Sequence, residues 1–180
     1  MRPRDVIKNA HENFVVERFV LWLNRRTGRN YEVIGKPEPP DALIEYQGEH
    51  KWVEHADIYR SSEEAREEYS LVTPGEEAYF HTEHPIVAPD ARIASRVYAI
   101  LQHKLSKSSY VEAHGKYGLG IPVLTERDSL FDESTLNEIC QFLDVAKYDD
   151  DRGFFEAAYL GIRSMGDLVF FQLYPRVERG

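Results

Sequence analysis

The stretch PPDALIEYQGEHKWVEHADIY, residues 39–59, decides the fold. It contains two runs of strand-forming side chains, Asp41–Tyr46 and Lys51–Tyr59, and the segment Gln47–His50 between them contains a glycine. Two such runs joined by a short segment with a glycine are typical of a β-hairpin. We therefore expect an antiparallel pair of strands at this point of the chain.

Two registers are open for this hairpin, and both place Asp41 and Glu54 on one face of the sheet. A two-residue turn at 47–48 puts the two acids directly opposite each other, whereas a four-residue loop makes them diagonal neighbours. Either register separates them by roughly 5–8 Å, a span that a divalent cation can bridge. A slip by one residue would send them to opposite faces. The hairpin is thus expected to hold a pair of carboxylates at one site.

Helical and strand patterns surround the hairpin. Apolar residues at helical spacing predict helices, and short β-prone runs bounded by Gly and Pro predict strands. The Gly-rich segment Gly115–Gly120 leads into one of these strands, and segment 60–91 is expected to be an irregular insertion. The order helix, three strands, helix, strand, helix, two strands predicts an α/β layer fold. The expected elements are helices at Val6–Arg25 and from Asp90 to about Lys107, a helix capped by Asp132, strands at Tyr31–Ile34 and Ile121–Leu124, and a second hairpin of Ala157–Arg163 and Leu168–Tyr174.

Length and charge limit the classes of function. The chain of 180 residues is expected to form one domain, 1–180, and its 42% hydrophobic content excludes a disordered protein. A formal net charge of −9 argues against a protein that coats nucleic acid through excess Lys and Arg. Contact with nucleic acid is therefore expected only through a local basic patch, and a homodimer is compatible with the sequence. The basic residues gather at Arg25, Arg26 and Arg29 and at Lys104, Lys107 and Lys116.

The location of the protein is expected to be cytoplasmic. The one cysteine, Cys140, is expected in the core, and it forms neither an intrachain disulfide nor a zinc cluster of cysteines. The longest apolar candidate, Phe14–Leu23, is interrupted by Glu17 and Arg18, which argues against a membrane span. The charged N-terminal residues do not have the pattern of a secretory signal. Motifs of P-loop, Rossmann, serine-esterase and zincin enzymes are also absent from the sequence.

Each of the two helices nearest the hairpin carries one charged residue inside its apolar stripe. These residues are Glu12 in the first helix and Lys104 in the later one. Charged groups aimed at a core are costly unless they are paired or bound to a ligand. Glu12, Asp41 and Glu54 are thus expected to hold Mg²⁺ or Mn²⁺, while Lys104 orients water or stabilises developing charge. This combination is typical of phosphodiester hydrolysis.

The arrangement resembles the PD-(D/E)XK nuclease superfamily of restriction endonucleases, Holliday-junction resolvases and repair nucleases. The helix, three strands, helix and strand of a restriction-endonuclease-like core match residues 6–125, interrupted by the 60–91 insertion. Residues 126–180 then form a C-terminal extension with a helix and a β-hairpin. The resemblance implies a metal-dependent nuclease acting on nucleic acid.

The family motif maps onto the first hairpin. Asp41 takes the place of the family's first aspartate and Glu54 that of its second acid, whereas Glu12, or alternatively Glu17, matches the acid of the first helix. The family lysine would stand two residues after Glu54, where this chain has Ala56. Lys104 is the candidate replacement, so the implied catalytic residues are Asp41, Glu54 and Lys104. The alternative is an inactive nuclease-like fold that serves as a protein-interaction or regulatory module.

Histidines outside this motif are expected to play lesser roles. His55 and Asp57 alternate to the other face of their strand, where solvation or a local hydrogen bond is expected. The pair His81 and His84 lacks a convincing metal-ligand spacing and is expected at the surface.

Overall fold

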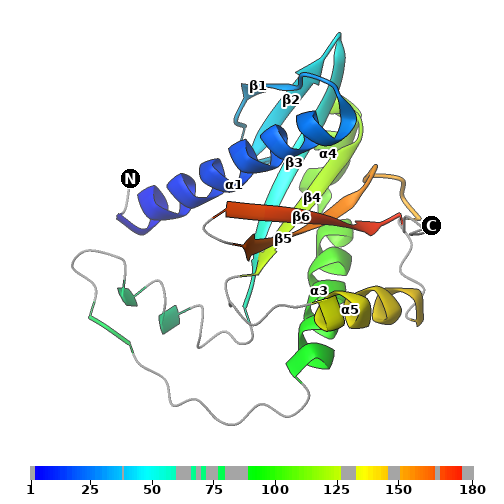
Figure 1. Ribbon diagram of the computed structural model, residues 1–180. Coiled ribbons are helices and arrows are strands. Elements are labelled where there is room, and N and C mark those ends of the chain that lie inside the picture. The colour runs from blue at the N-terminus through cyan, green and yellow to red at the C-terminus, as the bar shows by residue number, and fades with distance from the viewer. Residues whose placement is uncertain are drawn as a thin grey trace.

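The computed structural model describes residues 3–37, 39–59, 66–67, 70–71, 77–79, 89–126, 133–145, 151–164 and 167–175. Within them four helices surround a six-stranded mixed sheet (Figure 1), which confirms the expected α/β class. The helices are α1 (Pro3–Thr27), α3 (Pro89–Ser106), α4 (Ser108–Tyr117) and α5 (Glu133–Val145). The strands are β1 (Glu32–Gly35), β2 (Ala42–Tyr46), β3 (Glu49–Ile58), β4 (Gly120–Glu126), β5 (Ala158–Ser164) and β6 (Asp167–Tyr174).

The strands lie in the sheet in the same order as in the chain, β1 to β6. The three strands β1, β2 and β3 are antiparallel neighbours, β3, β4 and β5 run parallel, and β6 returns antiparallel to β5. The connection from β3 to β4 contains α3 and α4, and the connection from β4 to β5 contains α5. Parallel neighbours need long connections of this kind. The central strands β3 and β4 are therefore covered on both faces.

The turn of the first hairpin selects the two-residue register. Tyr46 pairs with Glu49, and both central residues have positive φ, 53° at Gln47 and 83° at Gly48. Positive φ at both central positions defines the type I′ turn, whose twist matches that of the strands. The hairpin is thus confirmed, and its turn decides which residues of β2 and β3 face each other.

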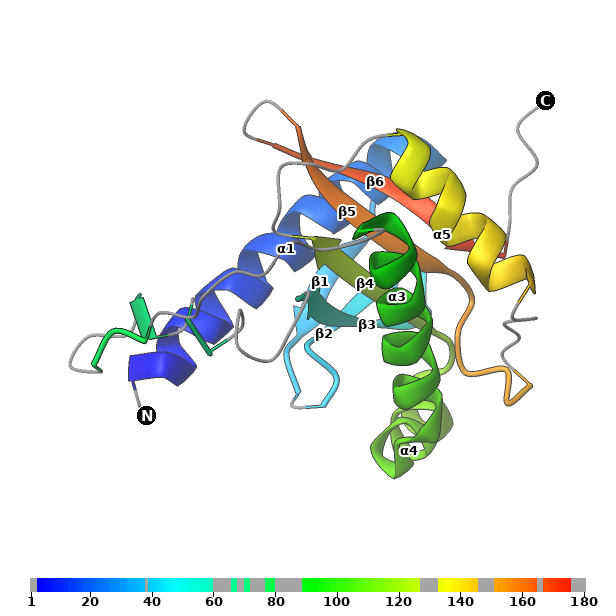
Figure 2. The ribbon, with the colours of Figure 1, turned by 90° about the horizontal axis from the view of Figure 1, so that it is seen from below.

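Side chains of β3 alternate between two apolar layers. Trp52 and Ile58 point into the layer formed by α3, α4 and α5, whereas Val53 points into the layer formed by α1. Figure 2 shows α1 on one side of the strands and α3 on the other. The fold is therefore three-layered, with one sheet between helices.

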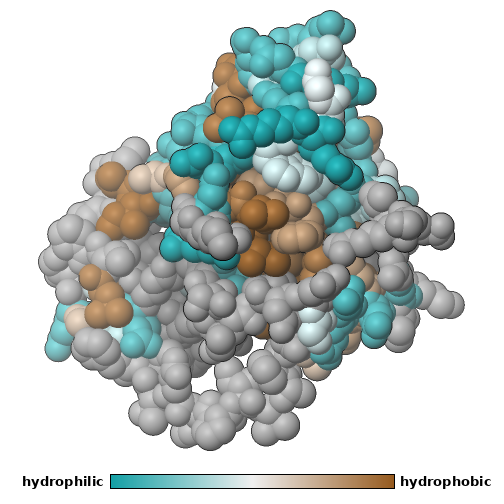
Figure 3. Space-filling view, in the orientation of Figure 1, coloured by the Kyte–Doolittle hydropathy of each residue, from teal (hydrophilic) through white to brown (hydrophobic). Residues whose placement is uncertain are grey.

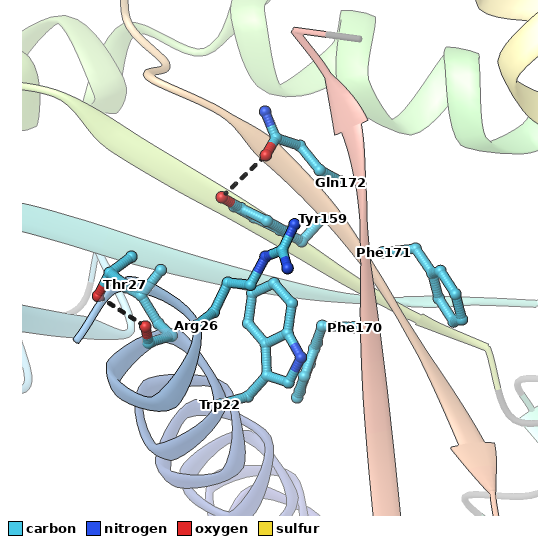
Figure 4. A pocket seen from close by; sticks show the side chains of 8 residues that line it. Trp22, Arg26, Thr27, Tyr159, Phe170, Phe171 and Gln172 are labelled. Carbon is cyan, nitrogen blue, oxygen red and sulfur yellow. Dashed lines mark hydrogen bonds between the residues drawn. The ribbon is translucent and has the colours of Figure 1, made fainter. Parts of the chain in front are cut away.

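The C-terminal hairpin belongs to the same sheet and to the α1 layer. Tyr159 of β5 and Phe170 of β6 pack with Phe19 and Trp22 of α1, with ring centroids 5.1–5.6 Å apart. Figure 4 shows Trp22 against Phe170, and these two residues and Arg26 are among those that line a cavity of about 540 Å³. The hairpin predicted at the C-terminus is confirmed, and it completes the core that residues before 126 leave open.

Helix α4 is the element that the sequence pattern missed. It has only two fully buried side chains, Tyr110 and Ala113, and it also contains Gly115. An apolar stripe of this length is too short to produce a recognisable helical period. Lys107, in extended conformation with φ −74° and ψ 127°, separates α4 from α3. The segment before β4 is therefore helical, not merely a Gly-rich approach.

Several expected features fall outside the described residues. These include most of the 60–91 insertion, the pair His81 and His84, and the Asp132 cap. Cys140 packs against the core on the α3 side, as expected. Among the described helices, none is both long enough and apolar enough to cross a bilayer.

The face that carries α1 and β6 is only partly polar. Figure 3 shows apolar atoms gathered near its centre and hydrophilic atoms over the end where the first hairpin turns. Exposed apolar side chains on these two elements include Phe14, Leu21 and Val169. Glu54 and Lys104 of the predicted site are buried.

Candidate functional site

The two carboxylates of the first hairpin face each other at the start of β2. Ala42 pairs with Val53, so one further step along each strand places Asp41 opposite Glu54. Asp41 Oδ2 accepts a hydrogen bond from the backbone N–H of His55 at 2.6 Å. This bond holds the Asp41 side chain against β3, beside Glu54.

Lys104 of α3 reaches Glu54 from the helix layer that covers this face of the sheet. Its side chain is buried, and Nζ donates to Glu54 Oε1 at 3.1 Å and to the backbone oxygen of His55 at 3.3 Å. The Tyr110 hydroxyl of α4 donates to the same Glu54 oxygen. The structure thus brings Asp41, Glu54 and Lys104 together and adds Tyr110, which sequence patterns could not reveal because α4 itself was not expected.

Glu12 lies at the edge of this group. It belongs to α1, and its carboxylate forms an ion pair with Lys8 at 3.1 Å, one helical turn earlier. Its negative charge nevertheless contributes to the raised pKa of Asp41, so the two carboxylates are electrostatically coupled. Glu17, the alternative acid of the first helix, is exposed. Glu12 is therefore paired with Lys8, and its recorded link to the group is the effect of its charge on Asp41.

Burial and the negative charge of Glu54 shift the pKa values of the residues in this group. Burial, followed by the charge of Glu54, raises the pKa of Asp41 to about 7. Burial lowers the pKa of Lys104, while Glu54 opposes this change. Burial and Glu54 both raise the pKa of Tyr110, so its hydroxyl stays protonated as a donor. A cation bound by Asp41 and Glu54 would offset the burial and the repulsion that together raise the pKa of Asp41.

One oxygen of Glu54 lacks a partner within the described part of the chain. Oε1 accepts from Lys104 and Tyr110, whereas the buried Oε2 receives no hydrogen bond there. A buried polar atom without a partner costs about 1–3 kcal/mol. Carboxylate oxygens are the ligands that Mg²⁺ and Mn²⁺ prefer. The residues present therefore fit a hard divalent cation held by Asp41 and Glu54.

A basic cavity adjoins this group on the α3 side. It has a volume of about 290 Å³, and Ala56 of β3 lines it together with Lys104. The side chain of Lys104 thus approaches the position where a lysine at residue 56 would project. The cavity offers several cationic side chains to an anionic ligand. Its other lining residues are Arg96, Ala99, Ile100, His103 and Lys107.

His55 and Asp57 form a separate cluster on the α1 side of β3. Both are largely buried, and they meet His11 of α1 and Thr125 of β4. Solvation or a local hydrogen bond was expected here, but the two side chains are largely buried and their hydrogen bonds to His11 and Thr125 join residues far apart in the sequence. The His-x-Asp spacing was the available signal, because residues two apart in a strand share a face.

The raised pKa of Asp41 predicts a pH-dependent stability in the metal-free protein. Between about pH 4 and pH 7 the unfolded chain releases the Asp41 proton while the folded chain keeps it, so the free energy of unfolding falls as pH rises. Asp41→Asn removes this loss and retains an acceptor for the His55 N–H. We expect the variant to be more stable than wild type by about 1–2 kcal/mol at pH 8, after allowance for solvent screening, and equally stable near pH 4.

Urea denaturation in EDTA at several pH values measures this difference. Asp151→Asn, a substitution at an exposed turn, serves as the control and should show no pH-dependent gain. Parallel stability curves for Asp41→Asn and wild type from pH 4 to pH 8 would contradict the prediction.

Comparisons with known proteins give no information about the chemistry of this site. No protein-family model, no curated protein and no solved structure matches the chain.

Proposed function

We propose that this chain is a metal-dependent nuclease of the PD-(D/E)XK type, with Asp41 and Glu54 as ligands of Mg²⁺ or Mn²⁺. Lys104 takes the role of the lysine that the family carries at the position of Ala56. The observation that carries the proposal is the meeting of Lys104 Nζ with Glu54 Oε1 at 3.1 Å, beside Asp41. Glu54 Oε2, buried and without a described donor, supports the metal-ligand role.

The order of elements supports the same proposal. Helix α1, strands β1 to β3, helix α3 and strand β4 follow the order of a restriction-endonuclease-like core, with α4 added before β4. The hairpin β5–β6 then extends that sheet beyond β4. We place the nuclease in the cytoplasm because its single cysteine suits a reducing compartment.

Each residue of the group has a distinct task in phosphodiester hydrolysis. Asp41 and Glu54 would hold Mg²⁺, which would supply charge neutralisation at the phosphate and a lowered pKa for the attacking water. Tyr110 and Lys104 keep Glu54 Oε1 occupied, so Oε2 remains the oxygen available for the cation. Lys104 lines the basic cavity, where its ammonium group can stabilise the charge that develops on the phosphate.

The basic cavity indicates how a nucleic acid approaches. Besides Lys104, the cavity is lined by Arg96, which precedes it in α3, and by Lys107, which follows the end of α3. Cationic side chains next to a reacting phosphate bind the backbone without reading its sequence. The interface is therefore a local patch, consistent with a chain whose net charge is −9.

Glu54→Gln tests the proposal through metal binding and through cleavage. Wild type should cleave labelled DNA or RNA oligonucleotides, single-stranded, duplex or branched, in Mg²⁺ or Mn²⁺ and not in EDTA, whereas the variant should lose this activity. Mg²⁺ at 100 times its Kd should stabilise wild type by about 2.7 kcal/mol, or raise Tm by about 5–10 °C. The variant should show no such shift.

Glu17→Gln is the matched control, because it removes the charge of an exposed acid on α1. It should bind Mg²⁺ and cleave like wild type. If Mg²⁺ and Mn²⁺ leave Tm unchanged and no substrate is cut, the proposal is wrong. That result would favour the alternative, an inactive nuclease-like fold that serves as a protein-interaction or regulatory module.

A further inference from the structure

A second cluster of metal-ligating atoms lies on the α1 side of β3. His11 Nε2 is 3.0 Å from Asp57 Oδ1, and His55 Nε2 is 3.4 Å from the same oxygen. Thr125 Oγ1 is 2.8 Å from Asp57 Oδ1 and 2.6 Å from His55 Nε2. Two imidazoles, a carboxylate and a hydroxyl from α1, β3 and β4 thus surround one point.

Three polar atoms from three elements lie close to one oxygen of Asp57. His11 Nε2, Thr125 Oγ1 and His55 Nε2 all lie within 3.4 Å of Asp57 Oδ1. Imidazole nitrogens and a carboxylate oxygen are common ligands of divalent transition-metal ions, so the cluster contains a suitable set of donor atoms. The side chains of His55 and Asp57 are 2% and 8% exposed, whereas that of His11 is 18% exposed. The cluster is therefore sheltered but still reached from the α1 edge.

The spacing of the three ligand atoms suits a small tetrahedral ion. All three lie within 4.8 Å of one another. A tetrahedral Zn²⁺ with bonds of about 2.0–2.1 Å separates its ligand atoms by about 3.3 Å. The two distances to Asp57 Oδ1, 3.0 and 3.4 Å, bracket that value. Little movement is thus needed to close the ligands around an ion.

We propose that His11, His55 and Asp57 form a binding site for Zn²⁺ or a similar transition-metal ion, separate from the Asp41–Glu54 site. Nitrogen ligands favour such ions, whereas the all-carboxylate pair on the other face of β3 favours Mg²⁺. The proposal rests on the geometry of this cluster and does not depend on nuclease activity. The ion ties α1 to the sheet through β3.

The bound ion also acts on a residue that both clusters share. The backbone N–H of His55 holds Asp41, and the backbone oxygen of His55 accepts from Lys104. An ion on the His55 side chain therefore restricts the peptide groups that orient the other site. The role assigned to this ion is positioning, because its ligands face away from Asp41 and Glu54.

Titration with Co²⁺ and Zn²⁺ tests the site directly. Co²⁺ added to the purified, metal-stripped chain should produce the visible absorption bands of a four- or five-coordinate ion with nitrogen ligands, and one equivalent of Zn²⁺ should bleach them. His11→Ala should weaken Zn²⁺ binding by about 100-fold or more, as measured against a chromophoric chelator. The variant should fold, because alanine is a favourable helix residue and His11 is partly exposed. Asp57→Asn should weaken binding as well.

Two controls separate this site from other sources of metal binding. His50→Ala removes an exposed histidine of the same strand and should bind Zn²⁺ like wild type. Glu54→Gln should lose the Mg²⁺ response and keep the Co²⁺ spectrum, so either site can fail while the other stands. No Co²⁺ spectrum in wild type, or equal Zn²⁺ affinity in His11→Ala and wild type, would show that the cluster is only a hydrogen-bonded network.

Discussion

Lys104→Met is expected to lower the rate of metal-dependent cleavage by about 100-fold or more and the free energy of unfolding by about 3–5 kcal/mol. The loss of rate follows from the loss of a cation beside the reacting phosphate. The loss of stability follows from Glu54, which would remain buried with Tyr110 as its donor but without a compensating charge. Single-turnover cleavage and urea denaturation measure the two effects.

A double variant separates the ion pair from the chemistry. Glu54→Gln together with Lys104→Met removes both charges, and replacement of a buried ion pair by neutral residues is often close to neutral for stability. We expect most of the lost stability to return while cleavage stays absent. Lys36→Met, at an exposed lysine that donates to Asn13, is the control and should change neither property. Full cleavage by the single Lys104→Met variant would remove Lys104 from the mechanism.

Gly120→Ala is expected to destabilise the protein by about 3 kcal/mol, at the upper end of the range for overpacking. A Cβ at residue 120 would overlap the six-membered ring of Trp52. Trp52 cannot yield easily, because it is fully buried and its Nε1 donates to Gly118 O at 2.8 Å. The β-carbon at this position therefore forces β3 and β4 apart.

The same substitution should also reduce cleavage, through Tyr110. The ring of Trp52 stacks on that of Tyr110 at 5.3 Å, and Tyr110 donates to Glu54. Gly115→Ala in α4 is the matched control, because its Cβ would meet no atom within 4 Å. It should stabilise the helix by up to about 1 kcal/mol. Equal thermal stability of Gly120→Ala and wild type would contradict the close packing at β4.

Elements with a clear local pattern were predictable to within a few residues. The apolar stripe of α1 and the alternation in β2 and β3 state which side chains face a core, because 3.6- and 2-residue periods are properties of the chain itself. The pair Asp41 and Glu54 was predictable for the same reason, since a short turn determines which strand positions oppose each other. Helix α4 was not, because two buried side chains do not make a period.

Contacts between distant segments had only indirect signals. The position of Lys104 within an apolar stripe indicated that it needed a partner, but Glu54 lies 50 residues away. Tyr110 and the meeting of His11 with His55 and Asp57 depend on how α4 and α1 dock on β3. No periodicity encodes these partners.

The sequence by itself determined the α/β class and the placement of two acids on one face of the first hairpin. It left two registers open for that hairpin, and the structure has the one with a two-residue turn. Tertiary structure decided that Lys104 reaches them beside Ala56, and that β5 and β6 complete the sheet. The physical reason is that local patterns specify which face of an element is buried. The partner that covers that face is selected only when the layers pack together.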